Sequence, residues 1–431
     1  MLMQIIKYPE KEMWKQLVSR PELDSGALMT TVSKIIADIK TDGDTALFEY
    51  INKFDGRLKG ELRITNEEIR IGITELSSEL KEAIDLAFNN IARFHASQVD
   101  GVKKIETSPG VICWRQSIAI ERVGLYIPGG TAPLFSTVLM LGIPAQLAGC
   151  KEVVLCTPAN KNGQINPAIL YAAQKTGISE IYKVGGAQAI AAMGVGTESI
   201  PKVDKIFGPG NQYVTAAKQL IQLNGVAIDM PAGPSEVCIL ADSSANPAFI
   251  AADLLSQAEH GIDSQVFLVS DSEFVLSETL RELKIQLERL ERKKLAASAL
   301  ENSKAILVHN LDEGMELVNA YAAEHLIIAS DKASDFVSQV KHAGSVFLGN
   351  YTPESAGDYA SGTNHTLPTN GYARAYSGVS LDSFIRKVTF QQITADGIKH
   401  LGQTIITMAE AEGLDAHAEA VRIRIKSLKD V

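Results

Sequence analysis

The sequence predicts an α/β protein with two doubly wound, largely parallel sheets, each an incomplete version of the Rossmann arrangement, and small helical pieces at both ends. From about residue 117, strand-like apolar runs alternate with helical segments, which is typical of right-handed βαβ units. About ten such runs exceed the five or six strands of a common sheet, so we expect two sheets. The 431 residues allow two or three domains.

The first hundred residues indicate helices. Two segments that end in turn residues cover 32–44 and 44–56, and a clear 3.6-residue apolar stripe covers 79–98. The alternation that follows predicts strands at 117–127, 152–158, 180–184, 204–207, 226–230 and 236–241. The helices between them are expected at 136–149, 166–177, 187–194 and 211–225.

The alternation resumes after a helix that ends near residue 260. We expect strands at 265–270, 305–309, 326–330 and 345–349, with one long charged helix over 274–300 and another helix that ends near Glu324. Residues 350–378 show little periodicity, and a loop of that length is usually functional or disordered. The last forty residues or so predict a small helical tail, with Asp415 as a cap of the final helix.

Composition excludes several classes of protein. The net charge of −10 argues against nucleic acid or an anionic membrane as partner. No run approaches the ~18 apolar residues of a membrane span, and the stretch MLMQIIKYPEKEMW becomes charged too early for a signal peptide. The four cysteines form no C-x-x-C pair, so neither a cysteine zinc site nor a disulfide framework is indicated. We expect a reducing, cytoplasmic compartment.

The stretch LLSQAEHG ends a helix on polar residues. Asn246 is suited to its N-cap, Pro247 to its first position and Gly261 to its end. Gln257 and His260 are three residues apart and share a face, so they could bind one ion. The alternative is a histidine stabilised by the helix dipole beside a solvated glutamine.

A second polar pair, Glu324–His325, precedes the predicted strand at 326–330. A carboxylate beside an imidazole suits general-base chemistry, although a capping histidine next to a surface glutamate would look the same. Asp358 lies among small residues that leave its carboxylate free to reach a metal. His417 falls in the first turn of the last helix, close to Glu412.

Three glycine-rich turns lead from strands into helices, at 127–130, 183–188 and 206–212. Backbone N–H groups at such helix starts favour phosphate. None of the turns matches G-x-G-x-x-G, and a Walker A motif is absent from the sequence. Three such turns in one sheet still favour a nucleotide crevice.

Eight segments together resemble histidinol dehydrogenase, in order and over nearly the whole chain: RVGLYIPGG, GGAQAIAA, FGPGNQYV, DMPAGPSE, DLLSQAEHG, AAEHL, GDYASGTNHTLPT and AEGLDAHAEAV. The resemblance implies oxidation of L-histidinol to L-histidine in two NAD-dependent steps, through an enzyme-held aldehyde. It also implies one zinc ion per active site and a homodimer.

The resemblance assigns roles to individual residues. The implied zinc ligands are Gln257, His260, Asp358 and His417, and the implied catalytic pair is Glu324 and His325. The residues that would contact NAD are Tyr126, Gln188 and Asn211, one from each glycine-rich turn. Ser235, Glu412, His325 and the zinc ligands would hold the substrate, with Glu412 and His417 donated by the other subunit. No catalytic role is assigned to the cysteines, and none to His365.

On this basis we divide the chain into four parts. Residues 1–22 form a helical N-terminal segment, 23–125 with 237–379 form the domain that carries the metal, 126–236 form the NAD-binding domain, and 380–431 form the helical tail. Two rival functions are a related dehydrogenase for another amino alcohol or diol and a zinc hydrolase. Glu412 and His417 disfavour the first, and the three glycine-rich turns disfavour the second. A metal-binding structural protein is disfavoured by the general-base pair.

Overall fold

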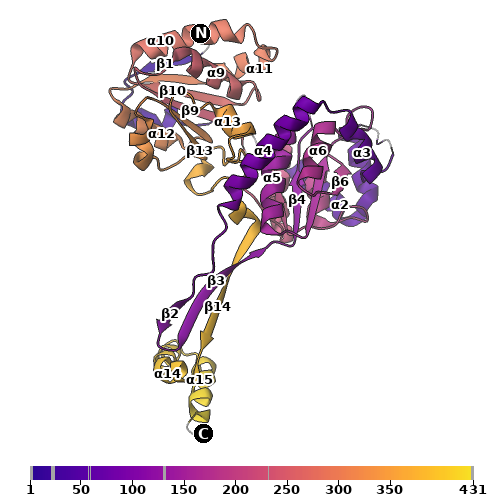
Figure 1. The fold of residues 1–431 in the computed structure, drawn as a ribbon, viewed down its shortest axis with the longest axis vertical. Helices are drawn as coiled ribbons and strands as arrows, with labels where there is room; N and C mark the ends of the chain where they lie inside the picture. Colours follow the sequence, from indigo (N-terminus) through magenta and orange to yellow (C-terminus); the bar gives the residue numbers. More distant parts are fainter. Residues whose placement is uncertain are drawn as a thin grey trace.

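Two parallel sheets and one antiparallel ribbon form the framework of the computed structural model, which describes residues 3–20, 25–56, 58, 60–129, 133–231 and 233–428. Figure 1 shows two α/β bodies side by side and a ribbon that leaves them. The two parallel sheets confirm the predicted fold class.

The first parallel sheet has six strands in the order β1-β11-β10-β9-β12-β13. Its central strands are buried along their whole length, as their continuous apolar runs predicted. The strands are β1 (Gln4–Lys7), β9 (Glu236–Ala241), β10 (Gln265–Ser270), β11 (Lys304–Leu307), β12 (His325–Ala329) and β13 (Ser345–Leu348).

The helices of this body cover both faces of the six-stranded sheet. One apolar core lies under α9 (Pro247–Ala258), α10 (Glu273–Leu287) and α11 (Lys293–Glu301). A second core lies under α12 (Leu311–Tyr321) and α1 (Trp14–Leu17).

The single helix predicted over 274–300 is wrong, because α10 and α11 are separate helices. A continuous helix of that length would extend about 40 Å, roughly twice the length of a six-residue strand. The break lets both halves stay on the sheet.

The second parallel sheet has five strands in the order β6-β5-β4-β7-β8. They are β4 (Arg122–Tyr126), β5 (Glu152–Thr157), β6 (Glu180–Lys183), β7 (Lys205–Phe207) and β8 (Ala227–Ile228). One core includes residues of α3 (Asn66–Thr74), α4 (Ser78–Ala96), α5 (Phe135–Ala148) and α6 (Pro167–Lys175). The other includes residues of α2 (Ser25–Phe54), α7 (Gly186–Val195) and α8 (Gln212–Ile221).

The N-terminal quarter of the chain packs on a different body from the one to which our domain division assigned it. Helices α2, α3 and α4 contact α7, α6 and α5, respectively, so these three helices cover the five-stranded sheet rather than joining residues 237–379. The cause is the apolar stripe of each helix, such as Ile35, Ile39 and Leu47 of α2, which enters the core of that sheet. As predicted, two helical segments meet near residue 44, at a break on Gly43. The start of the chain is not wholly helical, because β1 extends the six-stranded sheet.

An antiparallel ribbon connects the two bodies to the C-terminal tail. It consists of β2 (Ile105–Ser108), β3 (Val111–Ala119) and β14 (Ile385–Ile393). The predicted strand over 117–127 is therefore two strands, since β3 belongs to the ribbon and β4 to the five-stranded sheet. The start of the expected helical tail is strand β14.

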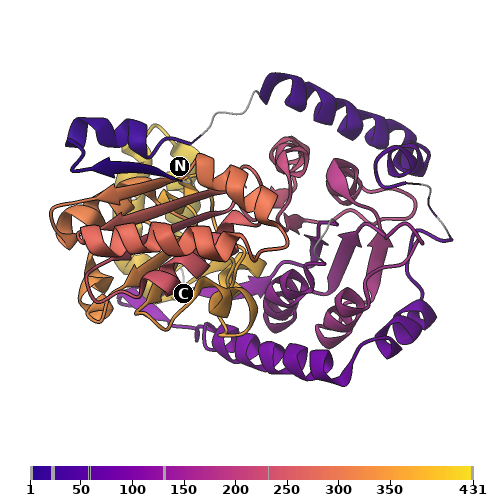
Figure 2. The ribbon, with the colours of Figure 1, turned by 90° about the horizontal axis from the view of Figure 1, so that it is seen from above.

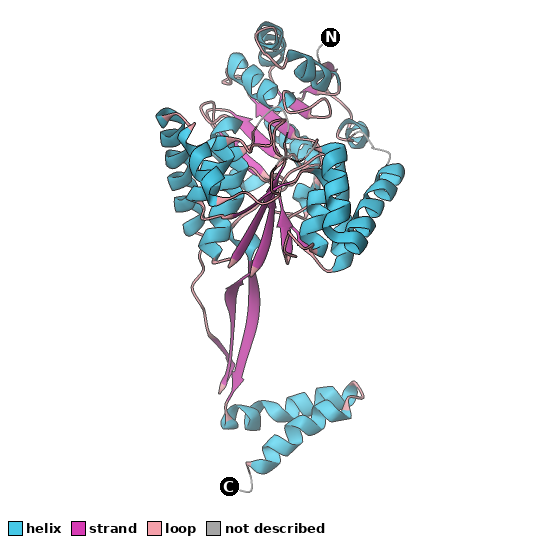
Figure 3. Ribbon diagram, turned by 90° about the vertical axis from the view of Figure 1, so that its right-hand side faces the viewer, coloured by secondary structure: helices cyan, strands magenta, loops and turns pink. Residues whose placement is uncertain are grey.

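The ribbon ends in two helices, α14 (Ala395–Ala411) and α15 (Asp415–Ser427), far from both bodies (Figure 3). Their shared core is small, with Ile406, Ala409, Ala418 and Val421 buried. None of the helices within the described ranges is long and apolar enough to cross a membrane.

Candidate active site

Polar residues gather at the amino ends of two neighbouring strands in the six-stranded sheet. His325 begins β12 and Glu236 begins β9, and both side chains are almost fully buried. The end of α9 supplies Gln257, and the short helix α13 (Glu354–Tyr359) supplies Glu354. Buried polar groups need partners, so the contacts within this cluster define what it can do.

The backbone of Glu236 holds the predicted catalytic pair. Its N–H donates to Oε2 of Glu324 at 2.9 Å, and its carbonyl oxygen lies 3.1 Å from Nδ1 of His325. Because a carbonyl can only accept a hydrogen bond, Nδ1 must carry the proton. Nε2 of His325 is then the basic nitrogen. It is buried without a hydrogen-bond partner among the described residues, 3.5 Å from Oδ1 of Asp358.

Three side chains beside this pair can offer ligand atoms to one cation. Atoms of His260, Glu354 and Asp358 all lie within 4.8 Å of one another. In the amide orientation that satisfies its neighbours, Gln257 donates to Glu354, and its oxygen accepts from the N–H of Glu236 at 3.1 Å.

The structure thus brings Gln257, His260 and Asp358 together, as predicted. It adds Glu354, which sequence reasoning missed. Its position four residues before Asp358 would have placed both carboxylates on one helical face.

The electrostatics of the cluster reflect several carboxyl groups buried close together. Burial raises the pKa of Glu324 to about 7 and that of Glu354 well above its usual range. Burial lowers the pKa of His325, but the charges of Glu324, Glu354 and Asp358 outweigh that effect and raise it to about 10. Burial lowers the pKa of His260. A cation at these oxygen and nitrogen donors would compensate the carboxylates, and this donor chemistry suits zinc.

Two predicted site residues lie elsewhere in the chain. Glu412 directly follows α14 and His417 lies in the first turn of α15, and both are exposed. The ribbon carries them away from the polar cluster (Figures 1 and 3). Within a single chain they are therefore not part of the cluster.

A pocket of about 1020 Å³ opens at the carboxyl ends of the strands in the five-stranded sheet. The three predicted NAD contacts, Tyr126, Gln188 and Asn211, all line it. The hydroxyl of Tyr126 accepts from the N–H of Gly186 at 3.0 Å, while the side chain of Asn211 caps α8. The predicted turns at 183–188 and 206–212 both contribute residues to this pocket. The turn at 127–130 is described only in part, because Gly130 lies outside the described residues.

One acidic side chain in this pocket was not predicted. Oδ2 of Asp55 accepts from the N–H of Gly185 at 2.9 Å and from the side-chain nitrogen of Gln188 at 3.2 Å. Burial raises the pKa of Asp55. Asp55 directly follows α2, some 130 residues before its partners, so local sequence carries no signal for this contact.

A fully buried ion pair fixes the turn that precedes α8. Nζ of Lys218 donates to the carbonyl of Gly208 at 2.9 Å, and Oδ2 of Asp229 accepts from the N–H of Gly208 at 2.9 Å. Gly208 has φ of +133°, and a Cβ there would lie 2.1 Å from the carbonyl oxygen of Tyr126. Only glycine fits at this position, because the turn that contains Gly208 approaches the backbone of Tyr126 so closely.

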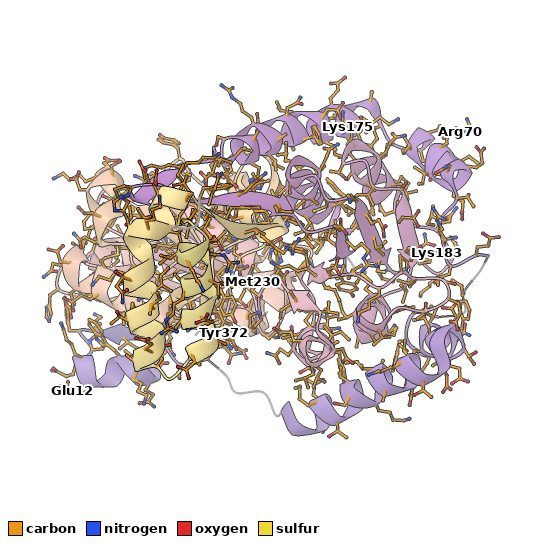
Figure 4. The ribbon with its side chains drawn as sticks, turned by 90° about the horizontal axis from the view of Figure 1, so that it is seen from below. Glu12, Arg70, Lys175, Lys183, Met230 and Tyr372 are labelled. Atoms are coloured by element: carbon orange, nitrogen blue, oxygen red, sulfur yellow. The ribbon has the colours of Figure 1, made fainter. Side chains whose placement is uncertain are left out.

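Hydrogen bonds connect the polar cluster to the five-stranded body. Nδ1 of His365 lies 2.8 Å from the carbonyl oxygen of Asp358, and Nε2 of the same ring lies 2.9 Å from Oγ1 of Thr137 in α5. Ser235, the remaining predicted substrate residue, directly precedes Glu236. Figure 4 shows Met230, in the segment that leads to Ser235, between the two bodies, and Figure 2 shows these bodies side by side from above.

Known proteins resemble this chain over its whole length. Residues 18–425 match the family model for histidinol dehydrogenase. The histidinol dehydrogenase of Bacteroides thetaiotaomicron is 60% identical, over 99% of this chain and 100% of the relative. That of Aliivibrio fischeri is 51% identical, over 96% of this chain and 94% of the relative. The crystal structure of histidinol dehydrogenase from Elizabethkingia anophelis superposes with a TM-score of 0.97 at 56% identity, covering 99% of each chain.

Proposed function

The chain belongs to the histidinol dehydrogenase family, and from this premise we propose that it oxidises L-histidinol to L-histidine in two NAD-dependent steps. The observation that carries the proposal is the buried Nε2 of His325, which has no hydrogen-bond partner among the described residues and lies 3.5 Å from Oδ1 of Asp358, beside the carboxylate of Glu324. The two groups supply a base for an alcohol and a base for water.

In the first step, Nε2 of His325 removes the proton of the substrate hydroxyl while hydride leaves the carbinol carbon, which gives the aldehyde L-histidinal. NAD, when bound, supplies the hydride acceptor. The hydrogen bond from Nδ1 of His325 to the carbonyl of Glu236 stabilises the imidazolium that forms.

In the second step, Glu324 takes a proton from water as the water oxygen adds to the aldehyde carbon, and the imidazolium of His325 returns its proton to the aldehyde oxygen, which completes the hydrate and restores the base. His325 then removes a hydroxyl proton of the hydrate as the second hydride leaves, giving L-histidine. The raised pKa of Glu324, about 7, suits a carboxylate that must accept a proton and release it again near neutrality.

We assign a zinc site to Gln257, His260 and Asp358, completed by His417 of the partner subunit. Zinc, when bound there, would supply a Lewis acid that fixes nitrogen atoms of the substrate. His260 and Asp358 lie together with Glu354, which Gln257 contacts, and carboxylate and imidazole donors gathered in this way support a cation. Glu354 contacts Gln257 and orients its amide.

We assign NAD to the pocket at the five-stranded sheet, through Tyr126, Gln188 and Asn211. Its volume, about 1020 Å³, is at the upper end of the common range for ligand pockets. Its place at the carboxyl ends of parallel strands is where nucleotides usually bind in such sheets. Ser235 would contact the substrate between this pocket and the zinc site, because it directly precedes Glu236.

We further propose that the enzyme is a homodimer of the cytoplasm in which Glu412 and His417 complete the site of the partner. The small core shared by α14 and α15 supports docking on another chain, since so few buried residues do not stabilise a unit alone. The four cysteines are free thiols, which suits a reducing compartment.

The test is absorbance at the NADH band with purified protein, NAD and L-histidinol. Two NADH and one L-histidine per L-histidinol are expected. A matched control is L-leucinol, an amino alcohol without the imidazole, which should give no NADH. Oxidation of both alcohols at similar rates would favour the broader amino-alcohol dehydrogenase. A hydrolysis that proceeds without NAD would favour the hydrolase.

A further inference from the structure

Glu236 occupies a central place in the polar cluster although its own carboxylate faces away from the catalytic pair. Its backbone N–H and carbonyl contact Glu324 and His325. Its side chain accepts two hydrogen bonds from the guanidinium of Arg20, Nε to Oε1 at 2.6 Å and Nη2 to Oε2 at 2.8 Å. The N–H of Asn370 donates to the same Oε1 at 3.0 Å.

The geometry points to Glu236 as a positioning residue for the two oxidation steps, clamped by Arg20 so that its backbone fixes the basic nitrogen of His325 and the carboxylate of Glu324. This inference rests on the proposed function. Neither Glu236 nor Arg20 is assigned a role by the family resemblance, and neither touches the reacting atoms.

The clamp is rigid for a physical reason. A bidentate contact between guanidinium and carboxylate fixes distance and plane together, which a single ammonium group cannot do. The carboxylate of Glu236 is 1% exposed, so water cannot replace Arg20. The Arg20 guanidinium also lies 4.2 Å over the ring of Tyr321, whose hydroxyl donates to Gln265 at 3.0 Å. The pair is therefore fixed on both sides.

The backbone of Glu236 then decides the tautomer of His325. With its carbonyl opposite Nδ1, the ring keeps its proton on that nitrogen and presents Nε2 as the base. A shift of this carbonyl would allow the other tautomer, in which Nε2 carries the proton and cannot accept one from a hydroxyl. The same shift would release Glu324, because both contacts come from one residue.

The first variant to test is Glu236→Gln, with the zinc content and folded fraction measured alongside. It keeps the size of the side chain but removes the charge that holds Arg20. We expect kcat for L-histidinol, and for L-histidinal supplied directly, to fall by about 100-fold, the effect of misplacing a catalytic group by about 1 Å. The KM values for substrate and NAD should change less than threefold, since no binding group is removed.

Arg20→Lys and Arg20→Met separate positioning from charge. Lysine keeps the positive charge and should retain more activity than methionine. Long-range ¹⁵N spectra of histidine-labelled, zinc-loaded protein, recorded at a pH at which the ring is neutral, should show the Nδ1–H form of His325 in the wild type and a mixture in Glu236→Gln. Leu17→Ala is the matched control, because Leu17 is buried in the same N-terminal segment and its apolar side chain makes no hydrogen bond to this network. It should lower the thermal midpoint and leave kcat per folded site unchanged.

Wild-type kcat in folded Glu236→Gln, or an unchanged tautomer, would overturn the inference. So would an equal loss of kcat in Leu17→Ala, because the effect would then be one of general stability. Failure of the proposed function gives a different result, namely a wild-type protein that forms no NADH from L-histidinol.

Discussion

The carboxylate of Asp55 lies 3.2 Å from the side-chain nitrogen of Gln188, and the same oxygen accepts the N–H of Gly185. A residue at the end of the first long helix thus orients the start of α7 in the pocket that we assign to NAD.

The first prediction follows from this contact. In Asp55→Asn, the amide oxygen can still accept both hydrogen bonds, but it is a weaker acceptor than a carboxylate oxygen. We expect KM for NAD to rise about three- to tenfold, the worth of one hydrogen bond of about 1 kcal/mol, with kcat at saturating NAD unchanged. Asp38→Asn, on the same helix but outside the pocket, should leave both values unchanged. A similar KM in both variants would contradict the assignment.

The second prediction separates the two bases. His325→Ala should impair both oxidation steps, whereas Glu324→Gln should mainly impair the step from aldehyde to acid, because only that step uses water. The affected rates should fall by about 10² to 10⁴. Single-turnover formation of NADH, from L-histidinol and from L-histidinal, measures each step. If Glu324→Gln slows both steps equally, Glu324 does not act on water alone.

The third prediction concerns the metal. A strong chelator should abolish turnover and added zinc should restore it, because the zinc site holds the substrate in the proposed reaction. Restoration can be titrated against bound zinc, with one ion per chain expected. A chelated protein that is free of metal and keeps full activity would refute the zinc site.

The fourth prediction concerns Glu354, which orients Gln257. Glu354→Gln should weaken zinc binding by about 10- to 100-fold, the usual effect of removing a group that orients a metal ligand. The measurement is competition with a zinc indicator of known affinity. Glu316→Gln is the control, because Glu316 is an exposed glutamate in the same body. Equal affinities in the two variants would leave Glu354 without a role at the metal.

The fifth prediction tests the shared site. His325→Ala and His417→Ala should each be inactive alone. Co-expressed, they should form mixed dimers in which one site carries both substitutions and the other carries none, so that about one wild-type site returns per mixed dimer. Mixed dimers purified through two different tags provide the sample. Their inactivity would show that each site is built from one chain.

The parallel sheets could be predicted because their central strands, such as β9, β10 and β12, are buried along their whole length and contain unbroken apolar runs. The ribbon could not be predicted, because β14 pairs with β3 about 270 residues earlier and neither strand has a strong period. Gln257 and His260 share a helix turn, so their common role was visible locally. Asp55, Glu236 and Arg20 act across long stretches of chain, and only the folded packing brings each to its partner.

The ribbon and its two helices have a consequence for how the enzyme responds to its own concentration. If α15 supplies a ligand to the neighbouring chain, dilution below the dissociation constant of the dimer removes catalysis and leaves the paired helices without support at the same moment. A newly synthesised chain would then be inactive until it formed a dimer with a second one. Specific activity should therefore rise with protein concentration before it reaches a plateau, and a tail peptide added in excess should inhibit by occupying the docking face.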